Sequence, residues 1–220
     1  MIDLRLGDCL DIMRGMSDKS VDWVITDPPY GINIGKMSFT KGGMVKKGSI
    51  LRTNFSEHSS WDTKPPGKEY FDEILRVSKN QIIFGGNYFT DKLYPSSGWI
   101  IWDKRGRVIP ERSFADGEMA WTSLQKPMRI ARFIWDGMIQ ENMAEKEVRH
   151  HPSQKPIALM RWIVEKYTNP EETILDPFMG AGSTGIACKQ TNHSFTGIEL
   201  DPYYFDIAKK RIEGTQEMML

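Results

Sequence analysis

Apolar residues in this chain alternate between short continuous runs and segments with helical spacing. The short β-rich runs predict strands at residues 2–6, 21–26, 81–84, 99–102, 173–176 and 195–199. Helical spacing and capping residues predict helices over 9–15, 65–77, 156–167, 183–190 and 202–212, with a short helix near 87–93. Residues 118–122 and 128–135 suit an antiparallel pair. This alternation, with no internal repeat, predicts one α/β domain over residues 1–220, built on a mostly parallel sheet covered by helices.

The composition excludes several classes of protein. Of the 220 residues, 40% are hydrophobic and 26% are charged, and no apolar run approaches the roughly 18 residues of a membrane span. The first residues lack the pattern of a signal peptide. Cys9 and Cys188 are the only cysteines, which argues against a disulfide scaffold or a cysteine zinc site. No metal is predicted, because no metal-ligand spacing links His58, His150, His151 and His193. We expect a cytoplasmic protein with no membrane contact.

The charge is balanced overall but unevenly distributed. The chain has 29 basic and 29 acidic side chains, yet residues 31–56 contain five basic residues and no acid. This stretch also lacks periodicity, so residues 31–60 are predicted to form a mobile basic loop. A basic face is what phosphate binding requires, although a solvated surface loop would have the same composition. The candidate DNA-binding residues are Lys36, Lys41, Lys46, Lys47, Arg52, Arg105, Arg107 and Arg112.

A glycine-rich segment follows the predicted strand 173–176 and opens the next helix. Its glycines, Gly180, Gly182 and Gly185, have the spacing G-x-G-x-x-G, which lets a ligand approach backbone N–H groups at the positive end of a helix. Glu199 ends the following strand, 19 residues after Gly180, where nucleotide-binding α/β units place the acid that binds ribose hydroxyls. The combination predicts a cofactor that contains adenosine. The alternative is a glycine-rich helix start beside a surface glutamate.

A second segment, Asp27-Pro28-Pro29-Tyr30, stands at the end of the hydrophobic strand 21–26. Ligands bind at the carboxyl ends of strands in open α/β sheets. Consecutive prolines make a stiff turn without N–H donors. Such a turn offers acceptors for the two N–H bonds of an exocyclic amino group, and the tyrosine ring offers a face for a flat base. The alternative is a proline turn with a packed tyrosine.

Together these segments resemble the DNA amino-methyltransferases that use S-adenosylmethionine. Asp27 to Tyr30 resembles their catalytic motif, Asp176 to Gly185 their cofactor loop, His151 to Pro156 the segment before that loop, and Gly7-Asp8-Cys9 a further motif. The catalytic motif comes first, as in the permuted β group. The resemblance implies a Rossmann-like domain with a circularly permuted strand order and a seven-stranded sheet containing one antiparallel strand. It leaves residues 104–150 as a small insert for target recognition, and it adds the expectation of a bacterial or viral origin.

The resemblance also assigns roles to residues. The Asp27 carboxylate and the Pro28 carbonyl would accept the hydrogens of the target amino group, Pro29 would stiffen the turn, and Tyr30 would stack on the flipped-out base. The residues implied to bind the cofactor are Asp8, Cys9, Asp27, Ser153, Gln154, Lys155, Asp176, Phe178, Gly180, Gly182, Ser183, Thr184, Glu199 and Leu200. No covalent intermediate is needed, so both cysteines are expected to be packing residues.

The favoured function is methylation of the N6 amino group of adenine in double-stranded DNA. An aspartate at the first catalytic position resembles the adenine enzymes more than the N4-cytosine enzymes, which often begin with serine. N4-cytosine methylation therefore stays as the close alternative. A nicotinamide-dependent oxidoreductase and a catalytically inert DNA-binding protein are alternatives from other classes. A homodimer and a restriction endonuclease of the same system are the further partners that stay open.

Overall fold

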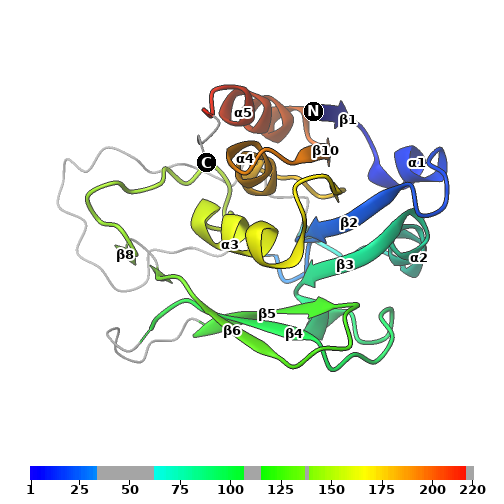
Figure 1. Ribbon diagram of the computed structural model, residues 1–220, viewed down its shortest axis with the longest axis horizontal. Helices are drawn as coiled ribbons and strands as arrows, with labels where there is room; N and C mark the ends of the chain where they lie inside the picture. Colours follow the sequence, from blue (N-terminus) through cyan, green and yellow to red (C-terminus); the bar gives the residue numbers. More distant parts are fainter. Residues whose placement is uncertain (34–61, 107–114, 137–138, 217–220) are drawn as a thin grey trace.

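The computed structural model describes residues 1–33, 62–106, 115–136 and 139–216. Its centre is an eight-stranded sheet in the order β1-β10-β9-β2-β3-β5-β4-β6, drawn in Figure 1. The strands are β1 (Ile2–Leu6), β2 (Val21–Thr26), β3 (Ser78–Phe84), β4 (Trp99–Asp103), β5 (Gly117–Thr122), β6 (Arg129–Arg132), β9 (Thr173–Asp176) and β10 (Ser194–Glu199). All neighbours pair in parallel except β5, which is antiparallel to β3 and β4. The mostly parallel sheet with one antiparallel strand is confirmed, but it has eight strands rather than seven.

The pairing of β6, the last strand in the order of the sheet, differs from the expectation. Residues 128–135 were expected to pair with 118–122 as a hairpin, and that pairing is wrong. β5 already has β3 on one edge and β4 on the other, so β6 pairs in parallel with the free edge of β4, with Ile100 opposite Arg129. The chain then forms a small separate hairpin from β7 (Trp135–Asp136) and β8 (Ile139–Gln140).

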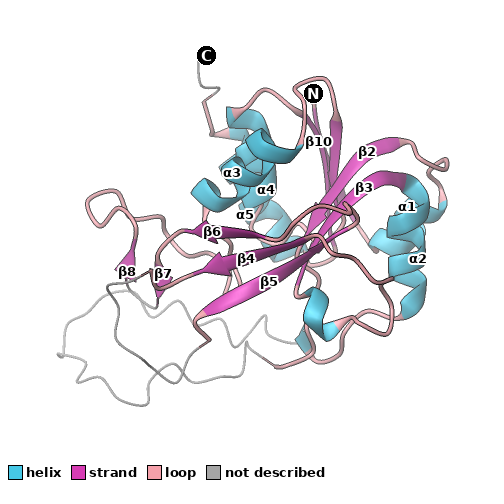
Figure 2. Cartoon of the chain, turned by 60° about the horizontal axis from the view of Figure 1, so that its bottom comes forward, coloured by secondary structure: helices cyan, strands magenta, loops and turns pink. Residues whose placement is uncertain are grey.

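Helices cover both faces of the sheet, as Figures 1 and 2 show. They are α1 (Cys9–Arg14), α2 (Lys68–Val77), α3 (Ile157–Tyr167), α4 (Ser183–Gln190) and α5 (Pro202–Glu213). α1 and α2 pack on one face, and α3, α4 and α5 on the other. The expected helix near 87–93 is a single 3₁₀ turn, Gly86–Tyr88, followed by further turns. No described helix is long and apolar enough to cross a membrane.

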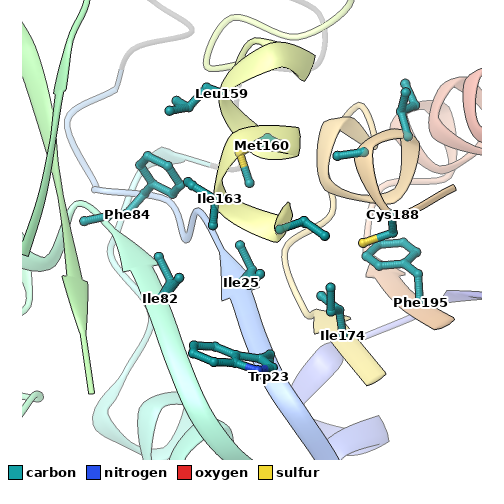
Figure 3. Packing of buried hydrophobic residues seen from close by; sticks show 14 of the residues in the cluster. Trp23, Ile25, Ile82, Phe84, Leu159, Met160, Ile163, Ile174, Cys188 and Phe195 are labelled. Carbon is teal, nitrogen blue, oxygen red and sulfur yellow. The ribbon is translucent and has the colours of Figure 1, made fainter. Parts of the chain in front are cut away.

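The strands alternate their side chains between two apolar clusters because successive residues of a strand point to opposite faces. Trp23 and Ile25 of β2 lie in the cluster under α3, whereas Val24 between them lies in the cluster under α1 and α2. Figure 3 shows Ile25 facing Ile163 of α3. Both layers are fully buried, so the sheet is a rigid support for groups at the ends of its strands.

Candidate active site

The carboxyl ends of four parallel strands, β1, β10, β9 and β2, surround a cavity of about 370 Å³. That volume is typical of a small-molecule site. Asp8 and Glu199 come from the two ends of the sequence and meet here, because β1 pairs with β10 in a register that sets Leu6 opposite Glu199. Asp27, which follows β2, and Asp176, which ends β9, line the same cavity. The two motifs on which the functional hypothesis depends therefore share one site.

Most of the residues expected to bind a cofactor line this cavity. They are Asp8, Cys9, Asp27, Ser153, Gln154, Lys155, Asp176, Phe178, Gly180, Ser183, Thr184, Glu199 and Leu200. Gly182 does not line it. At φ +80°, a Cβ on Gly182 would lie 3.0 Å from Ala208 and from Ile212 of α5. The absence of a side chain at Gly182 therefore makes room for α5.

The first glycine of the loop is the one that faces open space. Gly180 has φ +52°, and a Cβ placed on it would meet no atom within 4 Å. Its backbone N–H donates to Oε2 of Glu199 at 2.8 Å, and Asp201 donates its N–H to Oε1 at 2.9 Å. Burial raises the pKa of Glu199. The loop and the carboxylate are therefore held in a fixed relation at the cavity wall.

Asp176 is the buried anchor of the same loop. Its oxygens accept hydrogen bonds from the hydroxyl groups of Thr26 and Thr184, both at 2.7 Å, and from the N–H of Phe178 at 3.2 Å. Burial raises its pKa to about 6, against these hydrogen bonds. Thr26 ends β2 and Thr184 lies in the first turn of α4, so Asp176 joins β2 to the helix after the glycines.

Tyr70 is a cavity residue that the sequence analysis missed, because the helical spacing within residues 65–77 indicates an apolar face and not a ligand site. Its hydroxyl donates to Oδ2 of Asp8 at 3.2 Å, while Oδ1 accepts the N–H of Leu10 at 2.8 Å and caps α1. The Tyr70 ring lies 6.1 Å from that of Phe178. Burial and the neighbouring Asp8 carboxylate raise the pKa of Tyr70 to about 12. Two aromatic rings and a carboxylate thus line one end of the cavity.

The proline turn holds its functional groups in different places. Asp27 and Pro29 line the cavity, whereas Pro28 is buried and Tyr30 lies beside the cavity, half-buried. The Tyr30 hydroxyl donates to Oδ1 of Asp27 at 2.6 Å. Its ring stacks on that of Tyr88, with centroids 4.8 Å apart and an interplanar angle of 15°. The turn therefore directs a carboxylate towards the cavity and an aromatic ring away from it.

A cluster of charged side chains surrounds Asp27. The Lys155 ammonium pairs with Oδ2 of Asp27 and lies 3.1 Å from Oε2 of Glu118, and Lys104 pairs with Oε1 of Glu118. Burial raises the pKa of Asp27, against the attraction of Lys155. Burial acts in the same direction on Glu118, but Lys155 and Lys104 outweigh it and lower the pKa of Glu118 to about 2. We refer to Asp27, Lys155, Glu118 and Lys104 as the charge cluster.

Glu118 and Lys104 were also missed by the sequence analysis. They stand 91 and 77 residues after Asp27, Glu118 on β5 and Lys104 directly after β4, and no local pattern connects them to the motif at Asp27. Lys155 was expected near the cofactor because of the resemblance, and it does line the cavity. Its carbonyl accepts the Ser183 hydroxyl at 2.7 Å, which ties the 151–156 segment to the start of α4.

Most candidate DNA-binding residues lie outside the described part of the chain. These are Lys36, Lys41, Lys46, Lys47, Arg52, Arg107 and Arg112. Arg105 is described, and its side chain is only 12% exposed and pairs with Asp116. Within the expected recognition insert, β5 and β6 are integral strands of the main sheet. A role of residues 104–150 in target recognition stays a prediction.

Comparison with known proteins finds similarity to DNA methyltransferases. A family model described as DNA methylase matches residues 104–210. The Type II methyltransferase M.HinfI of Haemophilus influenzae is 26% identical, covering 94% of this chain and 67% of the relative. M2.DpnII of Streptococcus pneumoniae, a Type II methyltransferase, is 25% identical over 96% of this chain and 89% of the relative.

Solved structures extend the comparison. The M1.HpyAVI–SAM complex is 26% identical, covers 96% of this chain and 100% of the other, and superposes with a TM-score of 0.58. PvuII DNA methyltransferase, described as cytosine-N4-specific, is 13% identical with a TM-score of 0.57, covering 99% of this chain and 94% of the other. The second likeness shows the fold alone.

Proposed function

Since this chain belongs to the S-adenosylmethionine-dependent DNA amino-methyltransferases, we propose that it methylates the N6 amino group of adenine in double-stranded DNA. The observation that carries the proposal is that Asp27 and the glycine loop line one cavity. An acceptor for the amino group and a binding site for the methyl donor must be adjacent for direct transfer.

The residues of the cavity fit S-adenosylmethionine. The open space at Gly180 admits a ligand close to the backbone, and the partly buried Glu199 carboxylate lies beside it to accept hydroxyl groups of a ribose. Tyr70 and Phe178 offer apolar faces to an adenine ring, and Asp8 offers an acceptor to its amino group. The cofactor supplies an electrophilic methyl group on a sulfonium. The neighbouring carboxylates suit its positive charge.

The chain's own contribution to the reaction is positioning and electrostatic stabilisation. The lone pair of the target nitrogen is conjugated with the base ring and is a poor nucleophile. Asp27 and the Pro28 carbonyl accept hydrogen bonds from the two N–H groups of this nitrogen, which favours a tetrahedral nitrogen with a directed lone pair. The Asp27 carboxylate also stabilises the positive charge that develops on this nitrogen. Stacking on Tyr30 is worth about 1–3 kcal/mol and offsets part of the few kcal/mol needed to flip the base.

Adenine is favoured over cytosine because Asp27 stands at the first catalytic position. The shared fold does not separate the two, since a cytosine-N4-specific enzyme superposes equally well. The oxidoreductase alternative is dropped because the relatives are methyltransferases. We extend the proposal to a bacterial cytoplasmic setting and to a restriction–modification system with a matching endonuclease, in line with the Type II relatives. A homodimer is a further proposal.

One experiment tests both base and mechanism. Wild-type protein and Asp27→Ala are expressed in cells that lack DNA methylation, and their DNA is read by single-molecule sequencing. Wild type should leave N6-methyladenine in one sequence context. Asp27→Ala should lower turnover by about 100-fold or more, because the acceptor is gone, while calorimetry still detects cofactor binding. Methylated cytosine would contradict the assigned base, and near wild-type turnover of Asp27→Ala would contradict the assigned role.

A further inference from the structure

Each oxygen of the Asp27 carboxylate already has a donor in this structure. The Tyr30 hydroxyl donates to one oxygen of Asp27 at 2.6 Å, and the Lys155 ammonium pairs with the other. An ammonium bound to the acceptor weakens it towards a new N–H donor. It also places a positive charge beside a nitrogen that becomes positive during methyl transfer, which is unfavourable in a site of low dielectric constant. Transfer is therefore expected to require that Lys155 moves away from Asp27.

Glu118 is placed to receive Lys155. Its Oε2 lies 3.1 Å from the Lys155 ammonium and 3.4 Å from the Tyr30 hydroxyl, so both donors of Asp27 are also within reach of Glu118. The three charged side chains are well shielded from solvent, with exposures of 6% for Lys155, 18% for Asp27 and 21% for Glu118. Shielded charges interact more strongly than exposed ones.

Moving Lys155 from Asp27 to Glu118 changes no net charge. The charge cluster contains two carboxylates and two ammonium groups, and Lys104 holds the far oxygen of Glu118 in both arrangements. The low pKa of Glu118, about 2, keeps it ionised and able to bind a cation at any working pH. The exchange breaks the Lys155–Asp27 ion pair and keeps the Lys155–Glu118 pair, so Asp27 retains only the Tyr30 hydrogen bond and its unpaired charge is available to the target amino group.

We infer that Glu118 is a positioning residue that binds Lys155 during catalysis and so frees Asp27 to accept the target amino group. The inference rests on the proposed methyltransferase function and adds to it a group outside the catalytic motif. Glu118 reaches the reacting nitrogen only through Asp27 and the two donors of Asp27, Lys155 and Tyr30. Its removal should therefore affect turnover and the ionisation of Asp27, but not the binding of the cofactor.

The test uses Glu118→Gln, which keeps the shape and removes the charge. At saturating DNA and cofactor, kcat should fall at least about 10-fold, because Lys155 then stays on Asp27. The charged and titratable groups around Asp27 are Lys155, Glu118, Tyr30 and Asp176. Losing the negative Glu118 lowers the pKa of Asp27, so the acid limb of the kcat–pH profile should move down by about one unit. Glu118→Asp should restore the limb and part of kcat.

The matched control is Asp22→Asn. Like Glu118, Asp22 is a strand carboxylate that pairs with a lysine, Lys79, but it lies on β2 at the end remote from Asp27. It should lower the melting temperature without moving the acid limb. If Glu118→Gln lowers kcat with an unmoved limb, or moves the limb with unchanged kcat, the inference is overturned and the proposed function stands. An inactive wild type that binds cofactor would overturn the proposed function itself.

Discussion

Gly85 offers the sharpest test of how the aromatic ring of the catalytic turn is held. It follows β3 with φ +67°, and a Cβ built on it would lie 2.1 Å from Cε1 and 2.6 Å from Cδ1 of Tyr30. Non-bonded carbon atoms do not approach one another this closely, so one of the two groups has to move. Gly85→Ala therefore has to displace the Tyr30 ring, which would disturb its stacking on Tyr88 and its 2.6 Å hydrogen bond to Asp27.

Two contributions set the size of the effect. An alanine at positive φ costs about 1–2 kcal/mol of stability. Losing the stacking of a base on Tyr30 costs about 1–3 kcal/mol, which corresponds to a fall of about 5- to 150-fold in kcat/KM for DNA. Neither Gly85 nor Tyr30 lines the cofactor cavity, so the Kd of S-adenosylmethionine should stay within about twofold of wild type.

The assay is transfer of a radiolabelled methyl group to DNA at several DNA concentrations, with calorimetry for the cofactor. Gly106→Ala is the matched control, because Gly106 has φ +58° but its nearest contact to a new Cβ is Ile134 at 3.7 Å. This control measures the backbone cost without a displaced ring. A Gly85→Ala protein with kcat/KM within twofold of wild type would refute the role given to the position of Tyr30. A loss of cofactor affinity as large as the loss in kcat/KM for DNA would also refute this role.

Two further predictions concern the cofactor end of the site. Tyr70→Phe removes the hydrogen bond to Asp8, worth about 0.5–1.5 kcal/mol, so the Kd of the cofactor should rise about 2- to 12-fold in calorimetry, and an unchanged Kd would contradict this. Burial raises the pKa of Asp176 from 3.8 to about 6, so ionising it as pH rises through this window costs the folded state up to about 3 kcal/mol. Asp176→Asn should therefore gain unfolding free energy relative to wild type between pH 4 and pH 7. Denaturant unfolding at pH 4 and pH 7 measures the difference in free energy of unfolding between variant and wild type. The same difference at both pH values would contradict the prediction.

Local patterns predicted the elements better than their pairing. The helices that begin at Cys9, Ile157, Ser183 and Pro202 lie where spacing and capping residues put them. The pairing of β6 was missed, because spacing along the chain does not reveal that both edges of β5 are already occupied. Proximity in sequence favoured an antiparallel pairing with β5, whereas the free edge that β6 pairs with is that of β4.

The same distinction separates the cavity residues that the sequence indicated from the neighbouring residues that it did not. Asp27 and Glu199 stand at the ends of strands, and parallel strands bring such residues to one edge of a sheet. The sequence does not indicate that Glu118 lies near this edge, because β5 runs antiparallel to β3. The position of Glu118 follows from the pairing of β5 alone. Gly182 shows a second role that spacing does not reveal, because its missing side chain makes room for α5.

The cofactor site depends on strand register rather than on the order of motifs along the chain. Asp8 and Glu199 are 191 positions apart in the sequence, but Gly7 donates its N–H to the carbonyl of Glu199 at 2.9 Å at the ends of paired strands. A slip of one residue between β1 and β10 would turn the side chains of β1 to the opposite face and carry Asp8 away from the loop that contains Gly180. A permuted order of motifs therefore preserves the site as long as this one pairing is kept.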